Sequence, residues 1–226
     1  MLRAVIFDFD GVITDSESLH LRAFNQVLAQ YDIEITEEVY YKEYLGFTDR
    51  DCFESVVDIN KLELDSEQVE NLIKQKNVIF DKLATNEATI FEGVPQFLQM
   101  LTDNKIRRAI CSGALLADIQ PILEKSQLGH FFEEIVSAEQ IEKGKPDPEG
   151  FLLALKRLNE GSQNPVAADE CVVIEDSHWG LEAAIAAGMH TVGITNTYDA
   201  GQLTTAEKII ERFSELTIDD LKHLCA

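Results

Sequence analysis

The chain has 226 residues, of which 45% are hydrophobic and 27% are charged, a composition typical of a folded globular protein. Its length allows one large domain or a main domain that carries a smaller one, and we expect the second arrangement. The formal charge of −22 excludes the broad basic surface that nucleic acid or an anionic membrane requires, so we expect neither as a partner.

Short apolar runs alternate with longer amphipathic segments through most of the chain. Runs of strand length and strand composition lie at residues 4–7, 108–112, 134–138, 171–175 and 191–195. Helical patterns lie between them at residues 94–102, 115–125, 148–158 and 177–187. This alternation predicts an α/β fold, a Rossmann-like doubly wound parallel sheet with helices on both faces.

Residues 16–90 break the alternation, because they contain helical patterns and no convincing strand. A connection of this length far exceeds the few residues that usually join two elements, so we interpret it as an inserted, all-helical domain. We therefore predict an α/β core at residues 1–14 and 93–226 and a helical cap at residues 15–92.

Three acids follow the first predicted strand, in the stretch DFDGVITDS. Residues two apart in an extended chain point the same way, so the Asp8 and Asp10 carboxylates can reach one point, and Gly11 lets the backbone turn beside it. One acid can attack phosphorus while the other transfers protons, although such pairs also occur in metal sites and surface turns. Asp15 lies where the chain leaves the core, and we interpret it as a helix cap or hinge residue beside Ser16.

Two further acids follow the predicted strand at residues 171–175. Glu175 and Asp176, together with Asp8 and the carbonyl of Asp10, would form an oxygen-rich site. Mg²⁺ prefers a few carboxylates combined with water and substrate phosphate, so it is the cation we expect here. The alternative for Glu175 is that it does not bind the metal itself and lies either behind the metal ligands or on the surface.

Polar residues also follow the strands at 108–112 and 134–138. Ser112, followed by Gly113 and Ala114, offers a hydroxyl and backbone N–H groups that can hold phosphate oxygens, or it is an ordinary turn serine. Lys145 precedes a proline and should be extended in its loop, where its charge can hold Asp8 and a phosphate together. Lys143 is the rival candidate for this role.

The stretches DFDGVITDS, CSGA, GKPDP and VVIEDSHWG, in this order and spacing, resemble the four motifs of the haloacid dehalogenase superfamily. They are most similar to its branch of β-phosphoglucomutases and small-metabolite phosphatases, in which a helical cap follows the first motif. The roles that the resemblance implies are Asp8 as nucleophile, Asp10 as general acid and base, Ser112 as phosphate ligand, Lys145 as charge stabiliser, and Asp8, the Asp10 carbonyl and Asp176 as Mg²⁺ ligands assisted by Glu175.

The cap departs from the mutase pattern. The mutase has glycine, a small residue, serine and arginine where this chain reads GFTD at residues 46–49, with Arg50 one place later. Because the cap must hold a second phosphate for mutase action, this difference favours water as the acceptor of the phosphoryl group. We predict a Mg²⁺-dependent phosphatase of a small phosphorylated metabolite that acts through an aspartyl-phosphate. The alternatives are a β-phosphoglucomutase-type sugar-phosphate mutase and a non-catalytic protein that binds a phosphorylated metabolite.

Four cap residues are candidates for substrate contacts: His20, Thr48, Arg50 and Lys76. For His20 an ordinary position on a helix face is the alternative, and Lys74 competes with Lys76. For both lysines, a solvated position on the surface of a helix is the commoner alternative.

The remaining features bear on location. No apolar run approaches the roughly 20 residues that span a bilayer, and the amino-terminal run ends in acids where a secretory signal needs a cleavage site. Cys52, Cys111, Cys171 and Cys225 show no CxxC spacing, which favours reduced and buried thiols. We therefore expect a cytoplasmic monomer.

Overall fold

The computed structural model describes residues 1–45 and 47–226, which form two compact units. One unit, called the core unit below, joins Met1–Asp15 to Thr89–Ala226. The other, called the inserted unit, is Ser16–Ala88. The assignment of these units to a phosphotransferase core and a substrate-binding cap stays a prediction.

The core unit is built on a six-stranded sheet in the order β5-β4-β1-β6-β7-β8, and every neighbouring pair is parallel. Its strands are β1 (Ala4–Phe7), β4 (Arg107–Cys111), β5 (Glu134–Val136), β6 (Cys171–Glu175), β7 (His190–Ile194) and β8 (Lys208–Ile210). The predicted parallel sheet is confirmed. Strand β8 was not predicted, because three residues at a sheet edge give too short an apolar run.

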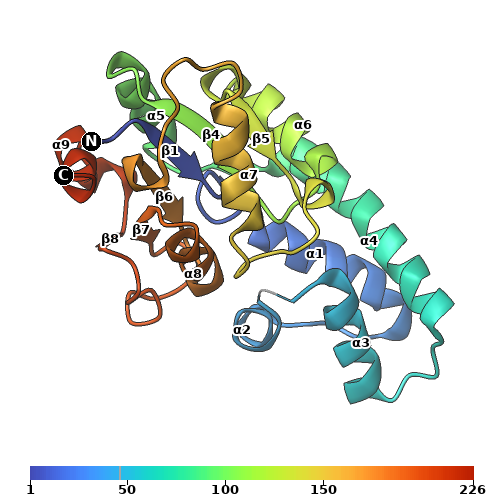
Figure 1. Ribbon diagram of the computed structural model, residues 1–226. Helices are drawn as coiled ribbons and strands as arrows, with labels where there is room; N and C mark the ends of the chain where they lie inside the picture. Colours follow the sequence, from blue (N-terminus) through green and yellow to red (C-terminus); the bar gives the residue numbers. More distant parts are fainter. Residues whose placement is uncertain (46) are drawn as a thin grey trace. The chain divides into compact units, whose positions relative to one another are not determined.

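Helices cover both faces of this sheet. They are α5 (Val94–Asp103), α6 (Leu116–Ser126), α7 (Glu149–Leu158), α8 (His178–Ala186) and α9 (Ile218–Leu224). Helices α7 and α8 lie on one face (Figure 1), where Ile6 belongs to the same buried cluster as Phe151 and Ala183. Phe7 points to the opposite face, and its ring centroid lies 6.0 Å from that of Phe97 in α5. Because β1 is buried on both sides, it reads as the continuous apolar run AVIF.

Two short strands mark where the chain leaves and re-enters the core unit. β2 (Thr14–Asp15) pairs antiparallel with β3 (Thr89–Ile90), so the two connections run side by side. The N-cap position of α1 belongs to Ser16, whose side chain makes no capping hydrogen bond. Asp15 is therefore a strand residue rather than a helix cap, and its role as a hinge residue stays a prediction.

The described residues of the inserted unit form helices joined by short irregular segments, and none of them belongs to a strand. Its helices are α1 (Glu17–Leu28), α2 (Glu37–Val39), α3 (Asp49–Asn60) and α4 (Ser66–Glu87), with a π-helical segment at Tyr40–Tyr44. Phe24, Phe53 and Leu72 belong to one buried apolar cluster of this unit. Asp65 and Gln68 form a reciprocal capping box that fixes the start of α4.

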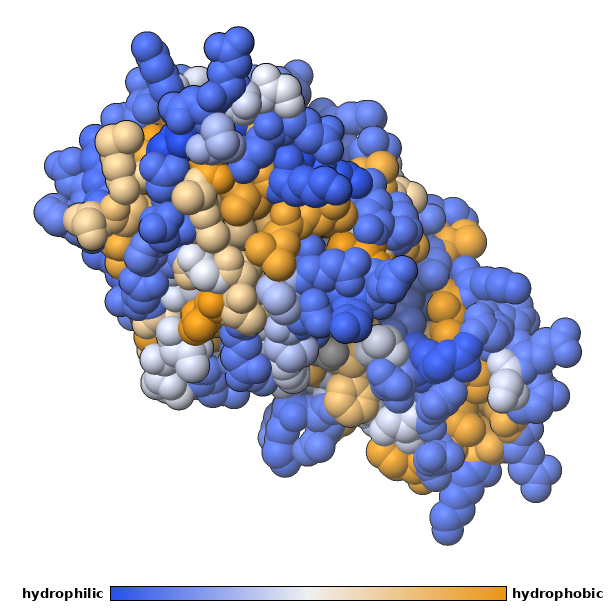
Figure 2. All heavy atoms as spheres, viewed as in Figure 1, coloured by the Kyte–Doolittle hydropathy of each residue, from blue (hydrophilic) through white to orange (hydrophobic). Residues whose placement is uncertain are grey.

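The side chains on one face of the molecule are mostly polar (Figure 2). Hydrophilic residues cover most of the face shown in Figure 2, as the net charge of −22 leads one to expect. Within the described part of the chain, every helix is too short or too polar to cross a membrane. All four cysteines are free and buried.

Candidate active site

The loops after β1 and β5 and the end of β6 bring three charged side chains together. The ammonium group of Lys145 donates hydrogen bonds to Oδ1 of Asp8 and to Oε1 of Glu175, the latter at 2.6 Å. Lys143, the rival candidate, has a side chain that is 72% exposed and pairs with Asp147 instead. The carboxyl ends of the strands thus meet at one point, as in other open parallel sheets.

Burial governs the charges of this cluster. The pKa of Asp8 is raised to about 8, chiefly because the carboxyl group is removed from water; the carboxylates of Glu175 and Asp10 contribute to this rise and Lys145 opposes it. Burial alone would lower the pKa of Lys145, but its two carboxylate partners outweigh that effect and raise it well above the ordinary value. Lys145 is therefore a permanent cation held against Asp8.

Glu175 is fully buried, and both of its oxygens are engaged. Oε1 accepts from Lys145, and Oε2 accepts from the backbone N–H of Ser177 at 2.9 Å and from its hydroxyl at 2.8 Å. A Cβ atom added to Gly180 would lie 1.7 Å from Oε1, so the carboxylate packs against the first turn of α8. These contacts position Lys145, and the predicted assistance of Glu175 in metal binding stays a prediction.

Asp176 lies against the turn that follows β1. Its Oδ2 atom is 1.8 Å from the place of a Cβ on Gly11, whose φ of +77° is itself a conformation that favours glycine. Burial and the charges of Glu175 and Asp8 raise the pKa of Asp176 well above its ordinary value, whereas a hydrogen bond with Thr197 lowers it.

Two residues after β7 complete this corner of the site. The Thr197 hydroxyl hydrogen-bonds Asp176, and Nδ2 of Asn196 donates to the carbonyl oxygen of Gly11 at 2.7 Å. Neither residue was among the predicted site residues. The rule that polar groups at the carboxyl ends of parallel strands converge would have found them, because they are the first and second residues after the predicted strand at 191–195.

The donor set of this corner fits Mg²⁺. Asp10 is partly exposed, and its carboxylate is near enough to Asp8 to raise the pKa of that group. Among the described residues, no three His, Cys, Asp or Glu side chains gather closely enough to hold a metal ion by themselves. Two carboxylates, Asp8 and Asp176, together with a backbone carbonyl are the kind of partial set that Mg²⁺ completes with water and phosphate. Both carboxylates are buried with raised pKa values, so a divalent cation would relieve their mutual repulsion.

The loop after β4 holds the predicted phosphate ligands. Ser112 is 2% exposed, and its Oγ accepts from the backbone N–H of Ala114 at 2.9 Å. Gly113 is exposed, and a Cβ added there would meet nothing within 4 Å. The Glu139 carboxylate accepts from the backbone N–H of Leu116 at 3.1 Å, so it occupies the amino terminus of α6.

In the inserted unit, two of the predicted substrate contacts form one buried cluster. Lys76 is 2% exposed, and its ammonium donates to Oδ1 of Asp49 at 2.7 Å and to Nδ1 of His20 at 2.8 Å. The His20 ring stacks on Phe80 with centroids 3.9 Å apart. Although His20 keeps part of its surface exposed, desolvation and the charge of Lys76 lower its pKa well below the ordinary value. His20 is therefore a neutral acceptor.

The other two predicted contacts lie at the start of α3. Thr48 is the N-cap of this helix and accepts from the backbone N–H of Asp51 at 3.1 Å. Arg50 forms ion pairs with Glu54 and Glu70. The first position of the predicted cap pattern, Gly46, lies outside the described residues. Contact of these side chains with a substrate stays a prediction.

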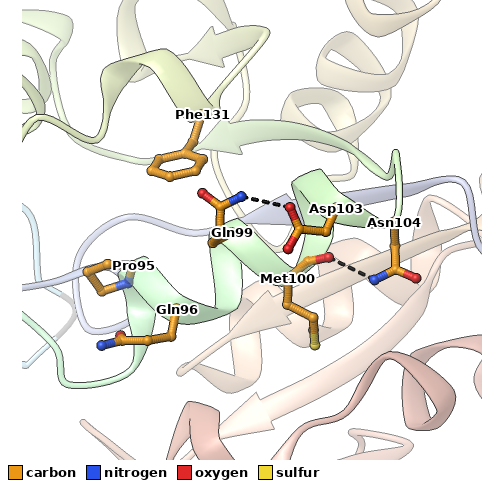
Figure 3. Close-up of a pocket in the computed structure, with 7 residues that line it drawn as sticks. All are labelled: Pro95, Gln96, Gln99, Met100, Asp103, Asn104 and Phe131. Atoms are coloured by element: carbon orange, nitrogen blue, oxygen red, sulfur yellow. Dashed lines mark hydrogen bonds between the residues drawn. The ribbon is translucent and has the colours of Figure 1, made fainter.

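A shallow depression elsewhere on the core unit carries none of these groups (Figure 3). It is lined by Pro95, Gln96, Gln99, Met100, Asp103, Asn104 and Phe131, mostly from the side of α5 that faces away from the sheet. Gln99 donates to Asp103 at 2.8 Å and Asn104 to the Met100 carbonyl at 2.9 Å, so local partners use these polar groups. The convergent polar groups lie instead at the carboxyl ends of the strands.

A comparison with known proteins identifies the family to which this chain belongs. A family model described as haloacid dehalogenase-like hydrolase matches residues 5–194, a span that contains all four predicted motifs. The chain belongs to the haloacid dehalogenase-like hydrolase family. The predicted family resemblance, the fold class and the prediction of an enzyme of this family are thereby confirmed.

Relatives of the chain include both phosphatases and a phosphoglucomutase. The chain is 29% identical over 203 residues to a phosphorylated carbohydrates phosphatase of Thermotoga maritima, covering 89% of each chain. It is also 29% identical over 225 residues to the β-phosphoglucomutase of Bacillus subtilis, covering 96% of this chain and 93% of the mutase. The crystal structure of CbbY from Rhodobacter sphaeroides in complex with phosphate superposes with a TM-score of 0.85 at 23% identity, covering 98% and 100% of the two chains, and so shares the fold.

Proposed function

We propose that this haloacid dehalogenase-like hydrolase is a Mg²⁺-dependent phosphatase of a small phosphorylated metabolite, a sugar phosphate or a similar phosphomonoester. The names of its relatives support phosphoryl chemistry on such compounds. The contact of Lys145 with Asp8 supports Asp8 as the group that attacks phosphorus, because a fixed cation offsets the charge of both the nucleophile and the incoming phosphate.

Asp10 is the proton-transfer group of this proposal. It lies two residues from Asp8 and is partly exposed, so it can reach both the leaving oxygen and water. Asp10 protonates the departing alkoxide while Asp8 becomes phosphorylated. It then takes a proton from the water molecule that attacks the aspartyl-phosphate, which releases phosphate and regenerates Asp8. Ser112 and the backbone N–H of Gly113 hold phosphate oxygens.

The metal-binding residues of the proposal are Asp8, Asp176 and the carbonyl of Asp10. A bound Mg²⁺ supplies positive charge that offsets the charge on the phosphoryl oxygens. Thr197 orients Asp176 through its hydrogen bond, and Asn196 fixes the Gly11 carbonyl next to it. Glu175 contributes by holding Lys145.

The observation that favours a phosphatase over a mutase is the charge pairing in the inserted unit. A mutase must hold the second phosphate of its substrate while the first is transferred. The two cations predicted to contact substrate, Arg50 and Lys76, are both paired with carboxylates of the same unit. Asp49 in particular neutralises Lys76, which leaves less positive charge for a second phosphate.

A sugar-phosphate mutase of the β-phosphoglucomutase type is the second candidate, and the identity with the Bacillus subtilis enzyme over 96% of this chain favours it. A protein that only binds a phosphorylated metabolite is less well supported, because Asp8, Asp10, Lys145 and Asp176 are all present. The expected cytoplasmic location belongs to the same proposal and is consistent with four free thiols.

The test is a screen of phosphorylated metabolites with and without Mg²⁺ that reads free phosphate and positional isomers in the same sample. The proposal predicts Mg²⁺-dependent phosphate release without isomerisation. Isomerisation without release would establish the mutase instead. Asp8→Asn should abolish turnover and Asp10→Asn should slow it strongly, while both variants keep the wild-type circular dichroism spectrum. Substantial turnover by Asp8→Asn would contradict the nucleophile assignment.

A further inference from the structure

Three aromatic rings cluster beside the candidate metal site. The centroids of His178 and Trp179 lie 3.9 Å apart with their planes at 35°. The Tyr198 ring meets both of them edge-on, at 5.6 Å from His178 and 6.2 Å from Trp179, each at an interplanar angle of 79°. These distances are those of favourable aromatic pairs, so the three rings hold one another in place.

The cluster is attached to the site from two sides. His178 and Trp179 are the first two residues of α8 and follow Asp176 by two and three positions. Tyr198 directly follows Thr197, whose hydroxyl hydrogen-bonds Asp176. The rings therefore come from the first turn of α8, which closely follows β6, and from the loop after β7, at the same sheet edge as Asp8.

All three residues are partly exposed. Burying a large aromatic side chain gives a large favourable free energy. A fixed aromatic group at the edge of a polar site is therefore typical of a surface that a ligand covers. The charged groups around Asp8 would hold the phosphate, which leaves the organic part of the substrate to reach these rings.

We propose that His178, Trp179 and Tyr198 form an aromatic subsite that stacks on the flat face of a ring in the organic part of the phosphate monoester. This inference rests on the proposed phosphatase function and adds a substrate class to it, namely ring-bearing phosphate esters in preference to open-chain ones. The ring is either a sugar ring, which would stack through its apolar face, or an aromatic ring. The test below uses a separate ester for each kind of ring.

The chain contains a single tryptophan, so its fluorescence reports on the subsite alone. The Asp8→Asn variant, which should bind without turnover, is titrated with phenyl phosphate, with a hexopyranose phosphate and with glycerol phosphate, and calorimetry measures the occupancy of each in parallel. At equal occupancy, a ring-bearing ester should change the Trp179 emission and glycerol phosphate should leave it nearly unchanged. Equal changes for all three esters, or binding without any change, would overturn the proposal.

Kinetics supply the second test, with a control that the chain itself offers. His130 and Phe131 form a similar pair, with centroids 4.1 Å apart at 36°, but they precede β5 and so lie at the amino end of the sheet. Trp179→Leu should lower kcat/KM for the ring-bearing ester by about 3- to 10-fold relative to glycerol phosphate, mainly through KM. Trp179→Phe should restore most of the preference, and Phe131→Leu should not affect it.

The outcomes separate this inference from the function on which it rests. If no ester releases phosphate but ring-bearing esters still change the emission, the phosphatase proposal fails and the subsite remains. If phosphate is released but Trp179→Leu slows ring-bearing and open-chain esters equally, the subsite proposal fails and the phosphatase remains.

Discussion

The ammonium nitrogen of Lys145 lies 2.6 Å from Oε1 of Glu175, a carboxylate that is fully buried. The same ammonium donates to Asp8, so Glu175 determines where the cation sits relative to the nucleophile. Neither residue is near the other in the sequence. The parallel order of β1 and β6, and the loop after β5, bring them together.

Replacing Glu175 by Gln should lower kcat by about 10- to 100-fold without abolishing turnover, because Lys145 loses a charged partner and its position relaxes. The Mg²⁺ concentration at half-maximal rate should stay constant if Glu175 acts only through Lys145. A large rise in that concentration would identify Glu175 as a metal ligand. Glu182→Gln, which changes an exposed acid on α8, is the matched control.

Gly180→Ala should disturb the same carboxylate by steric overlap. Alanine normally stabilises a helix relative to glycine, but here the added Cβ would lie 1.7 Å from Glu175 Oε1 and force it to move. We expect a loss of about 1–3 kcal/mol in the free energy of unfolding, measured by urea denaturation, together with reduced activity. Gly201→Ala, where an added Cβ meets nothing within 4 Å, should be near neutral. Wild-type stability of Gly180→Ala would mean that Glu175 is not held where we describe it.

Asp49→Asn should destabilise the protein by about 1–3 kcal/mol, because it leaves the buried Lys76 ammonium without its carboxylate. The double variant Asp49→Asn with Lys76→Met removes both charges and should recover much of that loss, which a double-mutant cycle in denaturant measures. Asp58→Asn, an exposed acid on the same helix, serves as control. Additive effects of the two substitutions would contradict the pairing.

His20 should give the unfolding free energy a pH dependence of known sign. Its folded-state pKa is lowered well below 6.5, so below pH 6.5 the unfolded chain binds a proton that the folded chain does not. The stability contribution of neutral His20 is present above pH 6.5 and is lost as the pH falls, by up to about 1.4 kcal/mol per pH unit. His20→Gln should remove this part of the slope, measured by denaturation between pH 5 and 7. A slope in His20→Gln equal to that of the wild-type protein would refute the assignment.

The sequence predicted the parts of the molecule that follow from local pattern. Strand β1 was predicted with its observed bounds, and the approach of Lys145 to Asp8 follows from the rule that parallel strands end at one edge. The pairing of Lys76 with Asp49 was not predicted, because it depends on which faces of α3 and α4 pack together. The same limit applies to the contact of Tyr198 with Trp179, since the two residues follow different strands and no local periodicity links them.

Hydrolysis through Asp8 can be followed with oxygen-18 water. The wild-type protein is incubated with Mg²⁺ and a hexopyranose phosphate in labelled water, and the phosphate and sugar phosphates are analysed by mass spectrometry. Hydrolysis should give inorganic phosphate that carries one labelled oxygen, with no isomerised sugar phosphate and no phosphate release by Asp8→Asn. Isomerised sugar phosphate without labelled inorganic phosphate, or release by Asp8→Asn at the wild-type rate, would contradict it.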